Sequence, residues 1–254
     1  MIDFKIVIPS RYASTRLPGK PLIDILGKTM LERVWLNAKK SQAKEVIIAT
    51  DDQRIASKAS RFGASVCMTS NEHQSGSDRI TEVIDQLEWN DEQIVLNLQG
   101  DEPLMSHTSM NECASLLDDD LIDIGTLGSS FINKEDWHNP NIVKVLLDHN
   151  DCALYFSRSS IPYLRKGDID IFKNNFVLQH HGIYAYKCKS LRMLAGLEDS
   201  QIQIAEGLEQ LKAVYHGLKI KVGAASVRPG VSVDIPEDID LVIDALKSIS
   251  EATL

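Results

Sequence analysis

Short apolar runs alternate with segments of helical periodicity along the first hundred residues. The runs at 4–9, 45–50, 65–69 and 93–99 have the length and composition of buried β-strands. Between them, apolar residues recur every three or four positions, which predicts amphipathic helices. These helices are expected to begin at Thr29, at Asp51 or Asp52, and at Ser77. Strands separated by such helices pair in parallel, so the pattern predicts an α/β fold.

The pattern changes in the second half of the chain. Residues 142–147 and 153–156 are strand-like, and the polar segment between them predicts a hairpin. We expect further strands at 176–186 and 219–227, a helix near 208–214, and a final helix that begins at Pro236. The whole chain, 1–254, is predicted to be a single domain with a smaller mixed lobe at about 130–190, inserted in or packed on the α/β core.

Composition and charge exclude several classes of protein. Hydrophobic residues make up 43% and charged residues 25% of the chain, as in ordinary globular proteins. The net charge of −9 argues against a non-specific nucleic-acid binder, which needs a basic surface. The four cysteines are scattered without zinc-site spacing, which favours a reducing compartment. With no membrane-spanning run and no signal-peptide pattern, we expect a cytoplasmic protein without nucleic-acid or membrane partners.

Three cations gather in the polar loop after the first strand, PSRYASTRLPGK. Arg11, Arg16 and Lys20 lie there, at the carboxyl end of a strand, where parallel sheets bind their ligands. We therefore favour a polyphosphate site over a solvated basic loop. The loop is not a Walker A motif, because Ser14 stands where that motif has glycine and Pro21 follows Lys20. No GxGxxG dinucleotide motif occurs in the chain.

A second candidate segment, HQSGSDR at 73–79, directly precedes a predicted helix. Backbone N–H groups near Ser75 and Ser77 can face an anion there. Arg79 lies in the first helical turn, where a cation opposes the helix dipole, and a ligand phosphate would explain that position. An ordinary serine cap followed by a surface arginine explains the segment equally well, so both interpretations stay open.

Two acidic segments have the chemistry of a magnesium site. Asp101 and Glu102 follow the fourth strand across Gly100, where carboxylates suit Mg²⁺, although a Gly-Asp turn is the better interpretation of that segment alone. Asp234 comes just before the final helix, where it would ordinarily be an N-terminal cap. A metal site becomes the better interpretation only if folding brings Asp101 and Asp234 to one ion.

Taken together, eight short segments resemble those of the 3-deoxy-manno-octulosonate cytidylyltransferases, also called CMP-Kdo synthetases. They are, in order, PSRYASTRLPGKPL, ATDD, HQSGSDR, NLQGDEP, ALYFSRSSIP, HGIYAYK, GLEQL and VDIPEDI. Each is weak alone, but eight in order, spread over residues from about 4 to about 245, are highly specific. The resemblance implies a nucleotide-diphospho-sugar transferase fold with a Rossmann-like mixed sheet. It also implies a homodimer, with the smaller lobe serving dimerisation and sugar binding.

The same resemblance implies a reaction and a set of site residues. CTP and an octulosonate-type sugar acid would give the CMP-sugar and pyrophosphate, for lipopolysaccharide biosynthesis, with Mg²⁺ as cofactor. The sugar's anomeric hydroxyl would attack the α-phosphorus, with Lys20, Arg11 and Asp101 as the catalytic residues. The implied nucleotide-binding residues are Pro9, Ser10, Arg11, Ser14, Lys20, Gln74, Ser75 and Arg79. The implied sugar-binding residues are Gln99, Arg158, His180, Tyr184, Glu209 and Gln210, and the metal ligands are Asp101 and Asp234.

On the sugar side, this sequence departs from the family pattern at two positions. Gln179 stands where the family has arginine, and Gln203 where it has glutamate. A salt bridge replaced by two amides would explain the pair. Alternatively, losing a cation relieves repulsion against a cationic substrate, such as 8-amino-3,8-dideoxy-manno-octulosonate. We favour this sugar slightly over ordinary 3-deoxy-manno-octulosonate.

Two other functions remain as alternatives. One is a cytidylyltransferase for nonulosonic acids, which the segments ALYFSRSSIP and GLEQL argue against. The other is a non-catalytic nucleotide-binding regulator, which the presence of Asp101 and Asp234 argues against. Histidines other than His180 and His181, including His73, show no ligand spacing and are expected to be surface or loop residues.

Overall fold

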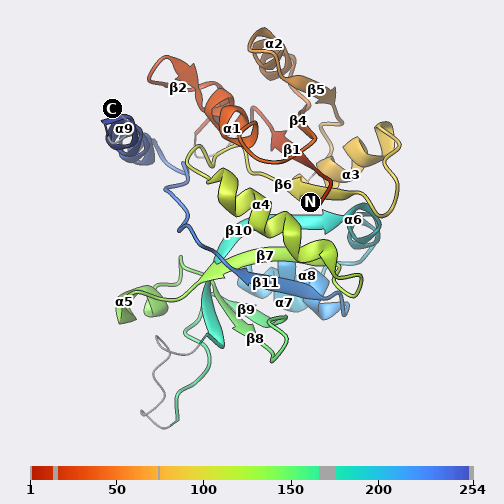
Figure 1. The fold of residues 1–254 in the computed structure, drawn as a ribbon, viewed down its shortest axis with the longest axis vertical. Helices are drawn as coiled ribbons and strands as arrows, with labels where there is room; N and C mark the ends of the chain where they lie inside the picture. The colour runs from red at the N-terminus through yellow and green to blue at the C-terminus, as the bar shows by residue number, and fades with distance from the viewer. Residues whose placement is uncertain (1, 14–16, 74, 166–174, 252–254) are drawn as a thin grey trace.

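The computed structural model describes residues 2–13, 17–73, 75–165 and 175–251. Its strands are β1 (Phe4–Ser10), β2 (Asp24–Ile25), β3 (Lys28–Thr29), β4 (Glu45–Thr50), β5 (Ser65–Met68), β6 (Ile94–Asn97), β7 (Ile124–Ser129), β8 (Lys144–Leu147), β9 (Ala153–Ser157), β10 (Val177–Lys187) and β11 (Ile220–Ala224). Its α-helices are α1 (Met30–Ala38), α2 (Gln53–Arg61), α3 (Gly76–Gln86), α4 (His107–Ser115), α5 (Lys134–His138), α6 (Cys188–Ala195), α7 (Gln201–Glu206), α8 (Gln210–Tyr215) and α9 (Pro236–Glu251), with 3₁₀ turns at Lys20–Leu22 and Leu116–Asp118. Figure 1 shows their arrangement.

A mixed sheet forms the centre of the molecule, with strand order β11-β7-β10-β6-β1-β4-β5. Strands β6, β1, β4 and β5 pair in parallel with one another, as the alternation of strands and helices predicted. β10 runs antiparallel between β6 and β7, and β11 pairs in parallel with β7. The predicted α/β fold with a Rossmann-like mixed sheet is confirmed.

The middle residues of β1, β4 and β6 are apolar because helices cover both faces of the sheet. Val7 and Ile47 belong to the core cluster that also contains Ile80 of α3. Ile6 and Ile8 point to the opposite cluster, which the buried sides of α1, α2 and α4 complete. Alternate residues of one strand thus enter different cores, which requires a continuous apolar run.

β7 was not among the expected strands, although all six of its residues are buried. Its sequence, IGTLGS, has two glycines and one serine, and therefore lacks the uninterrupted apolar run by which β1, β4 and β6 were recognised. Pairing with β10 on one side and β11 on the other stabilises β7 as a strand. Residues 124–129 therefore form a strand because of their neighbouring strands, and their own sequence does not predict one.

The start of α3 differs from the expected start at Ser77. Ser75 is the N-cap: its Oγ accepts the N–H of Asp78 at 3.1 Å, and the Asp78 carboxylate accepts the N–H of Ser75 at 3.3 Å. This reciprocal capping box needs an acid or amide three residues after the serine. Ser77 has Ile80 at that position, so the cap lies two residues earlier than expected.

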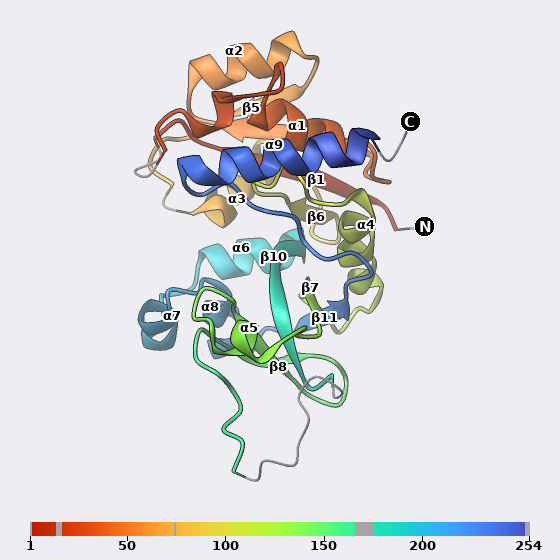
Figure 2. The same ribbon diagram turned by 90° about the vertical axis from the view of Figure 1, so that its left-hand side faces the viewer.

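The predicted hairpin is present as β8 and β9, which pair antiparallel. β8 also pairs with the first residues of β10, so the hairpin and the core share one sheet. Figure 2 shows β10 running from the level of β8 towards β6. The assignment of about 130–190 to dimerisation stays a prediction.

At the other end of the chain, α9 begins at Pro236, as expected. Val233 and Val242 pack on Ile25 and Met30, which places the C-terminal helix beside α1 and β2 (Figures 1 and 2). Within the part of the chain that the structure describes, no helix combines the length and apolar character needed to span a membrane.

Two histidines are adjacent in β10, of which His181 is buried and His180 is half-buried. His180 Nε2 is 3.1 Å from Thr126 Oγ1, and His181 Nε2 is 2.9 Å from Ser129 Oγ. Burial lowers the pKa of His180 to about 3, with His181 as the second cause, and burial together with the charge of Arg228 lowers the pKa of His181 to about 4. Both rings are therefore neutral near pH 7.

The depressed pKa of His181 predicts a loss of stability in mild acid. The unfolded chain binds this proton near pH 6.5 and the folded chain only near pH 4, so stability falls as the pH drops between these values. From pH 7 to pH 5, His181 should account for about 2 kcal/mol of the lost unfolding free energy. Urea denaturation at both pH values should show a correspondingly smaller loss for His181→Asn than for the wild type. The exposed control His149→Asn should behave like the wild type, and equal losses in all three proteins would contradict the assignment.

Candidate active site

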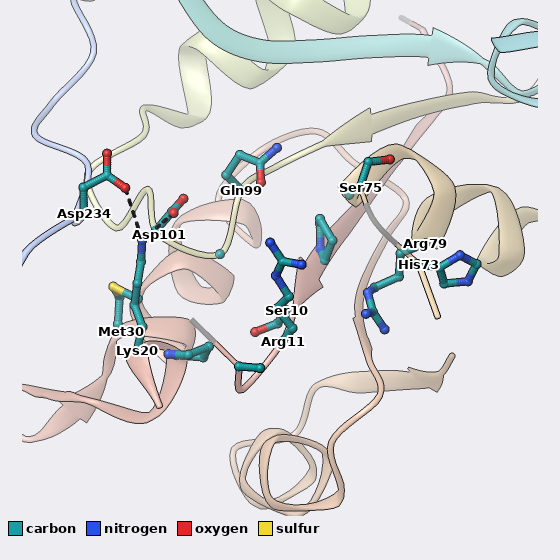
Figure 3. Close-up of a pocket in the computed structure, with 15 residues that line it drawn as sticks. Ser10, Arg11, Lys20, Met30, His73, Ser75, Arg79, Gln99, Asp101 and Asp234 are labelled. Atoms are coloured by element: carbon teal, nitrogen blue, oxygen red, sulfur yellow. Dashed lines mark hydrogen bonds and ion pairs between the residues drawn. The ribbon is translucent and has the colours of Figure 1, made fainter. Parts of the chain in front are cut away.

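The carboxyl ends of the parallel strands β1, β4 and β6 meet at one edge of the sheet, where such folds bind ligands. A cavity of about 360 Å³ lies there, a size typical of small-molecule sites. It is lined by the segments that follow β1 and β6, by the start of α3, and by one residue from before α9 (Figure 3). The lining residues are Pro9, Ser10, Arg11, Ala13, Lys20, Pro21, Met30, His73, Ser75, Gly76, Arg79, Gln99, Gly100, Asp101 and Asp234.

Two acids from distant parts of the chain meet one lysine at one end of this cavity. Lys20 Nζ donates to Asp101 Oδ2 at 2.6 Å and lies 3.6 Å from Asp234 Oδ1 (Figure 3). Lys20 is only 9% exposed, so water screens its charge weakly, whereas the side chain of Asp234 is 48% exposed and is screened more strongly. Folding therefore brings Asp101 and Asp234 to one lysine, and that they share a metal ion stays a prediction.

Local backbone geometry places Lys20. Gly19 adopts a left-handed conformation with φ 71°, and its N–H donates to the carbonyl of Tyr12 at 3.1 Å. A Cβ at Gly19 would lie 3.1 Å from the Tyr12 hydroxyl oxygen, so glycine lets the loop close on that ring. On α2, the guanidinium of Arg54 stacks 3.3 Å from the Tyr12 ring centroid and pairs with Asp52. Tyr12, and through it Gly19, is thus held against α2.

The segment before α9 is joined directly to the loop after β6. Val233 donates its N–H to the carbonyl of Asp101 at 3.0 Å. Gly230 packs so closely on Leu104 that a Cβ there would lie 2.4 Å from the Leu104 Cβ. These two contacts place Asp234 beside Asp101, and the Asp234 side chain extends to Lys20.

A third acid, Glu102, lies behind this pair. Its Oε2 is buried, and the described residues offer that atom no hydrogen bond. Burial raises the pKa of Glu102 to about 8, and the negative charges of Asp101 and Asp234 add to the shift. Glu102 is therefore mostly protonated at neutral pH, which spares the cluster a third negative charge.

The opposite end of the cavity is formed around Arg79, which is only 3% exposed. Its guanidinium donates to Thr69 Oγ1 and to the Ser70 carbonyl, and lies 3.4 Å from Asp51. The alternative of a serine cap followed by a surface arginine is therefore half right. Ser75 is the cap, but Arg79 is buried. These contacts within the protein explain why Arg79 can occupy the first turn of α3, so no ligand phosphate is needed to explain its position.

His73 lines the same end of the cavity and was missed as a site residue. It lies in a loop, as expected, with its Nε2 hydrogen-bonded to Glu82. The available signal was its place at the start of HQSGSDR, the segment already singled out for Ser75 and Arg79.

A second cavity, of about 420 Å³, adjoins the first, since Ser75 and Gln99 line both. The corner between α7 and α8 forms one wall, and Tyr184 of β10 lies on another. Gln99 donates to Asn97 Oδ1 at 3.5 Å, which orients its amide near the junction. The remaining lining residues include Ser77, Asp78, Tyr186, Asp199, Gln203, Leu208, Glu209, Gln210 and Lys212.

The second cavity is acidic. Asp78, Asp199 and Glu209 line it, and the lining cation Lys212 lies 3.3 Å from Asp199. Desolvation raises the pKa of Glu209, the charges of Asp78 and Asp199 raise it further, and Arg11 opposes them. An anionic group of a ligand would therefore avoid this wall, whereas hydroxyl or ammonium groups fit it.

Most of the predicted site residues line one of the two cavities. The first contains Pro9, Ser10, Arg11, Lys20, Ser75, Arg79, Gln99, Asp101 and Asp234, and the second contains Gln99, Tyr184, Glu209 and Gln210. Ser14 and Gln74 lie outside the described residues. Asn97, Asp78, Tyr186, Asp199 and Lys212 were missed. Asn97, Asp78 and Tyr186 lie within the segments NLQGDEP, HQSGSDR and HGIYAYK, which was a usable signal, whereas Asp199 and Lys212 lie in none of the eight segments.

Arg158 and His180 line neither cavity in the part of the chain that the structure describes. The Arg158 guanidinium donates to the backbone carbonyls of Glu206 at 2.9 Å and Pro140 at 3.3 Å. His180 is hydrogen-bonded to Thr126 instead. Their predicted contacts with a sugar stay predictions.

Comparison with known proteins agrees with this arrangement. Residues 5–220 match the family model described as cytidylyltransferase. The 3-deoxy-manno-octulosonate cytidylyltransferase 2 of Actinobacillus pleuropneumoniae serotype 5b is 43% identical, over 95% of this chain and 97% of the relative. The chain belongs to the 3-deoxy-manno-octulosonate cytidylyltransferase family. A further relative, from Halorhodospira halophila, is 44% identical over 96% of this chain and 97% of its own.

A solved member of the cytidylyltransferases has the same fold. The structure of CMP:2-keto-3-deoxy-manno-octonic acid synthetase complexed with CTP superposes with a TM-score of 0.89 at 37% identity, covering 97% of this chain and 99% of its own. The protein is thus a nucleotidyltransferase, a CTP-dependent cytidylyltransferase with the nucleotide-diphospho-sugar transferase fold. Membership in an enzyme family removes the alternative of a non-catalytic regulator.

The contact of Gly230 with Leu104 predicts that Gly230→Ala lowers cytidylyltransferase activity. The added methyl group would push the segment carrying Asp234 away from Asp101, and such a displacement should lower kcat roughly 10- to 100-fold. Steady-state pyrophosphate release and a thermal melt measure activity and folding separately. Gly196→Ala is the control, because a Cβ there makes only ordinary contacts. Activity of Gly230→Ala equal to that of this control would contradict the assigned role.

Proposed function

We propose that the protein transfers CMP from CTP to an octulosonate-type sugar acid and releases pyrophosphate. The observation that carries this proposal is the cluster of Lys20, Asp101 and Asp234 in a cavity that shares Gln99 and Ser75 with a second, acid-lined cavity. The names of the relatives support the sugar acid, and the solved synthetase of the same fold, complexed with CTP, supports the nucleotide.

The two cavities suit the two substrates. The first offers Arg11 and Lys20 to a triphosphate, and these cations neutralise charge that builds on phosphate oxygens during phosphoryl transfer. The second offers hydroxyl, amide and carboxylate groups, which fit a polyhydroxylated sugar. The anomeric hydroxyl would then reach the α-phosphorus near Gln99 and Ser75, which both cavities share. No covalent enzyme intermediate is needed.

The acids at the first cavity fit a magnesium ion. Mg²⁺ takes one or two carboxylates and completes its coordination with phosphate oxygens and water. Asp101 and Asp234 supply two carboxylates within reach of one ammonium, and the described residues hold no cluster of three or more potential metal ligands. When bound, the ion would neutralise phosphate charge, and Asp101 and Asp234 would hold it in place.

Removing the charge of Asp101 should abolish turnover while leaving the fold intact. Asp101→Asn removes a proposed metal ligand and the partner of Lys20, so we expect at least a 100-fold fall in kcat, about 2.7 kcal/mol. Pyrophosphate release in CTP, Mg²⁺ and sugar measures this loss, and EDTA should reproduce it with the wild-type protein. The control is Asp244→Asn, an exposed acid on α9 that lines neither cavity. Near-normal turnover in Asp101→Asn would remove Asp101 from the metal site.

The acidic wall favours a second candidate substrate with an ammonium group. The relatives are named for 3-deoxy-manno-octulosonate, which supports the 8-hydroxy sugar. However, Gln203 lines the acidic cavity at a position where the family pattern has glutamate, and Gln179 replaces a family arginine. An ammonium at C8 would find the carboxylates of Asp78, Asp199 and Glu209 on the wall of the second cavity, which Gln179 does not line. 8-Amino-3,8-dideoxy-manno-octulosonate is therefore the alternative substrate of the same reaction.

Turnover of the two sugars distinguishes these substrates. If the acidic wall selects an ammonium group, kcat/KM should be higher for the 8-amino sugar. Glu209→Gln should then reduce that preference by about tenfold, because one attractive charge is lost. Competition between the two sugars, at fixed CTP and Mg²⁺, measures the ratio. A strong preference of the wild type for the 8-hydroxy sugar would reject the 8-amino alternative.

A further inference from the structure

The wall of the second cavity that carries Glu209 and Gln210 depends on how α7 ends. Glu206 is the last residue of α7, and Gly207 turns the chain in a left-handed conformation with its N–H on the carbonyl of Gln203. Leu208 donates to the same carbonyl at 3.2 Å. The turn at residues 207–210 is therefore a rigid extension of the end of α7.

Packing alone holds α7 weakly. The helix has only six residues, and none of them is buried. Isolated helices of this length are unstable, so α7 needs fixed ends. Ser200 and Gln203 form a capping box at its beginning, and Glu206 provides the contacts at its end.

Three hydrogen bonds join Glu206 to the end of β9. The hydroxyl of Ser157 donates to Glu206 Oε1 at 2.6 Å, and the N–H of Arg158 donates to Oε2 at 2.9 Å. The Nε of Arg158 donates to the Glu206 carbonyl at 2.9 Å. Both carboxylate oxygens and the carbonyl oxygen of one residue are thus held by two consecutive residues. We call this set of bonds the Glu206 clamp.

The β9 side of the clamp is itself fixed by a buried cation. Lys144 is 0% exposed, and its Nζ donates to the carbonyls of Arg158, Asn139 and Ile142 at 2.7 to 2.8 Å. Burial lowers the pKa of Lys144, the charge of Arg158 lowers it further, and Glu206 opposes both. The carboxylate of Glu206 is thus a nearby negative charge beside this buried cation, and its hydrogen bonds with Ser157 and Arg158 are charge-assisted.

We propose that Glu206 is a positioning residue for the sugar-side wall. By tying the end of α7 to Ser157 and Arg158, it determines where Glu209 and Gln210 lie in the second cavity. The hairpin of β8 and β9 therefore contributes to sugar binding without lining the cavity. The inference rests on the proposed function only in assigning the second cavity to the sugar.

Glu206→Gln tests the clamp with a nearly isosteric side chain. The amide keeps one acceptor but presents N–H groups where Ser157 or Arg158 already donates. We expect KM for the sugar acid to rise about tenfold, whereas calorimetric affinity for CTP changes less than about twofold. Glu198→Gln, at an exposed glutamate shortly before α7, should leave both values unchanged.

Hydrogen exchange provides a readout that does not depend on turnover. In Glu206→Gln, the amides of Gly207, Leu208 and Leu211 should exchange faster, while those of the central sheet stay protected. Ser157→Ala removes a single bond and should move exchange and sugar KM in the same direction by smaller amounts.

Two results would overturn the proposal. One is unchanged sugar KM and unchanged exchange in Glu206→Gln. The other is an equal loss of sugar and CTP binding, which would indicate general destabilisation instead of positioning. If the wild type turns over neither octulosonate, the proposed function is rejected. Faster exchange at 207–211 in Glu206→Gln would then still support the Glu206 clamp as a structural feature.

Discussion

The active-site architecture depends on one ammonium group placed between two carboxylates. Lys20 comes from the loop after β1, Asp101 from the loop after β6, and Asp234 from the segment before α9. Their contact joins three regions that are far apart in the chain and draws the C-terminal helix over the N-terminal part of the molecule (Figure 2). Because Lys20 is nearly buried, its charge and those of the acids stabilise one another only while this geometry is kept. Tyr12, Gly19, Leu104 and Gly230 do not carry charge, yet they decide whether the geometry forms.

The antiparallel strand β10 connects the two halves of the site. It lies between β6, whose loop carries Asp101, and β7, and it also pairs with the hairpin strand β8. Its residue Tyr184 lines the second cavity, while its neighbours His180 and His181 turn into the interior as neutral rings. The opposite wall comes from α7 and α8, and α7, which buries none of its residues, is joined to the hairpin through Glu206. The walls of the first and second cavities are thus supported by different parts of the same sheet.

The sequence predicted those elements that depend on residues close together in the chain, and missed those that depend on distant neighbours. The runs that became β1, β4 and β6 were recognised because a strand buried on both faces must be apolar throughout. Helix starts were recognised where a cap lies next to its partners in sequence, as at Thr29 and Asp52. At SGSD the presence of two serines led to the wrong one, although Asp78 identifies Ser75 as the cap. β7 escaped notice because its strand character comes from β10 and β11, which lie on either side of it.

The sequence by itself determined the α/β class, the cationic loop after β1, the acids Asp101 and Asp234 and, through its ordered motifs, the enzyme family. It could do so because strand periodicity and motif spacing are local properties of the chain. Only the tertiary structure decided that Asp101 and Asp234 share a lysine, that Arg79 is buried against Asp51, and that Arg158 braces Glu206. It also decided that Asp78, Asp199 and Glu209 form one acidic wall. Each of these contacts joins segments whose separation in space is set by sheet pairing and helix packing, which no local pattern encodes.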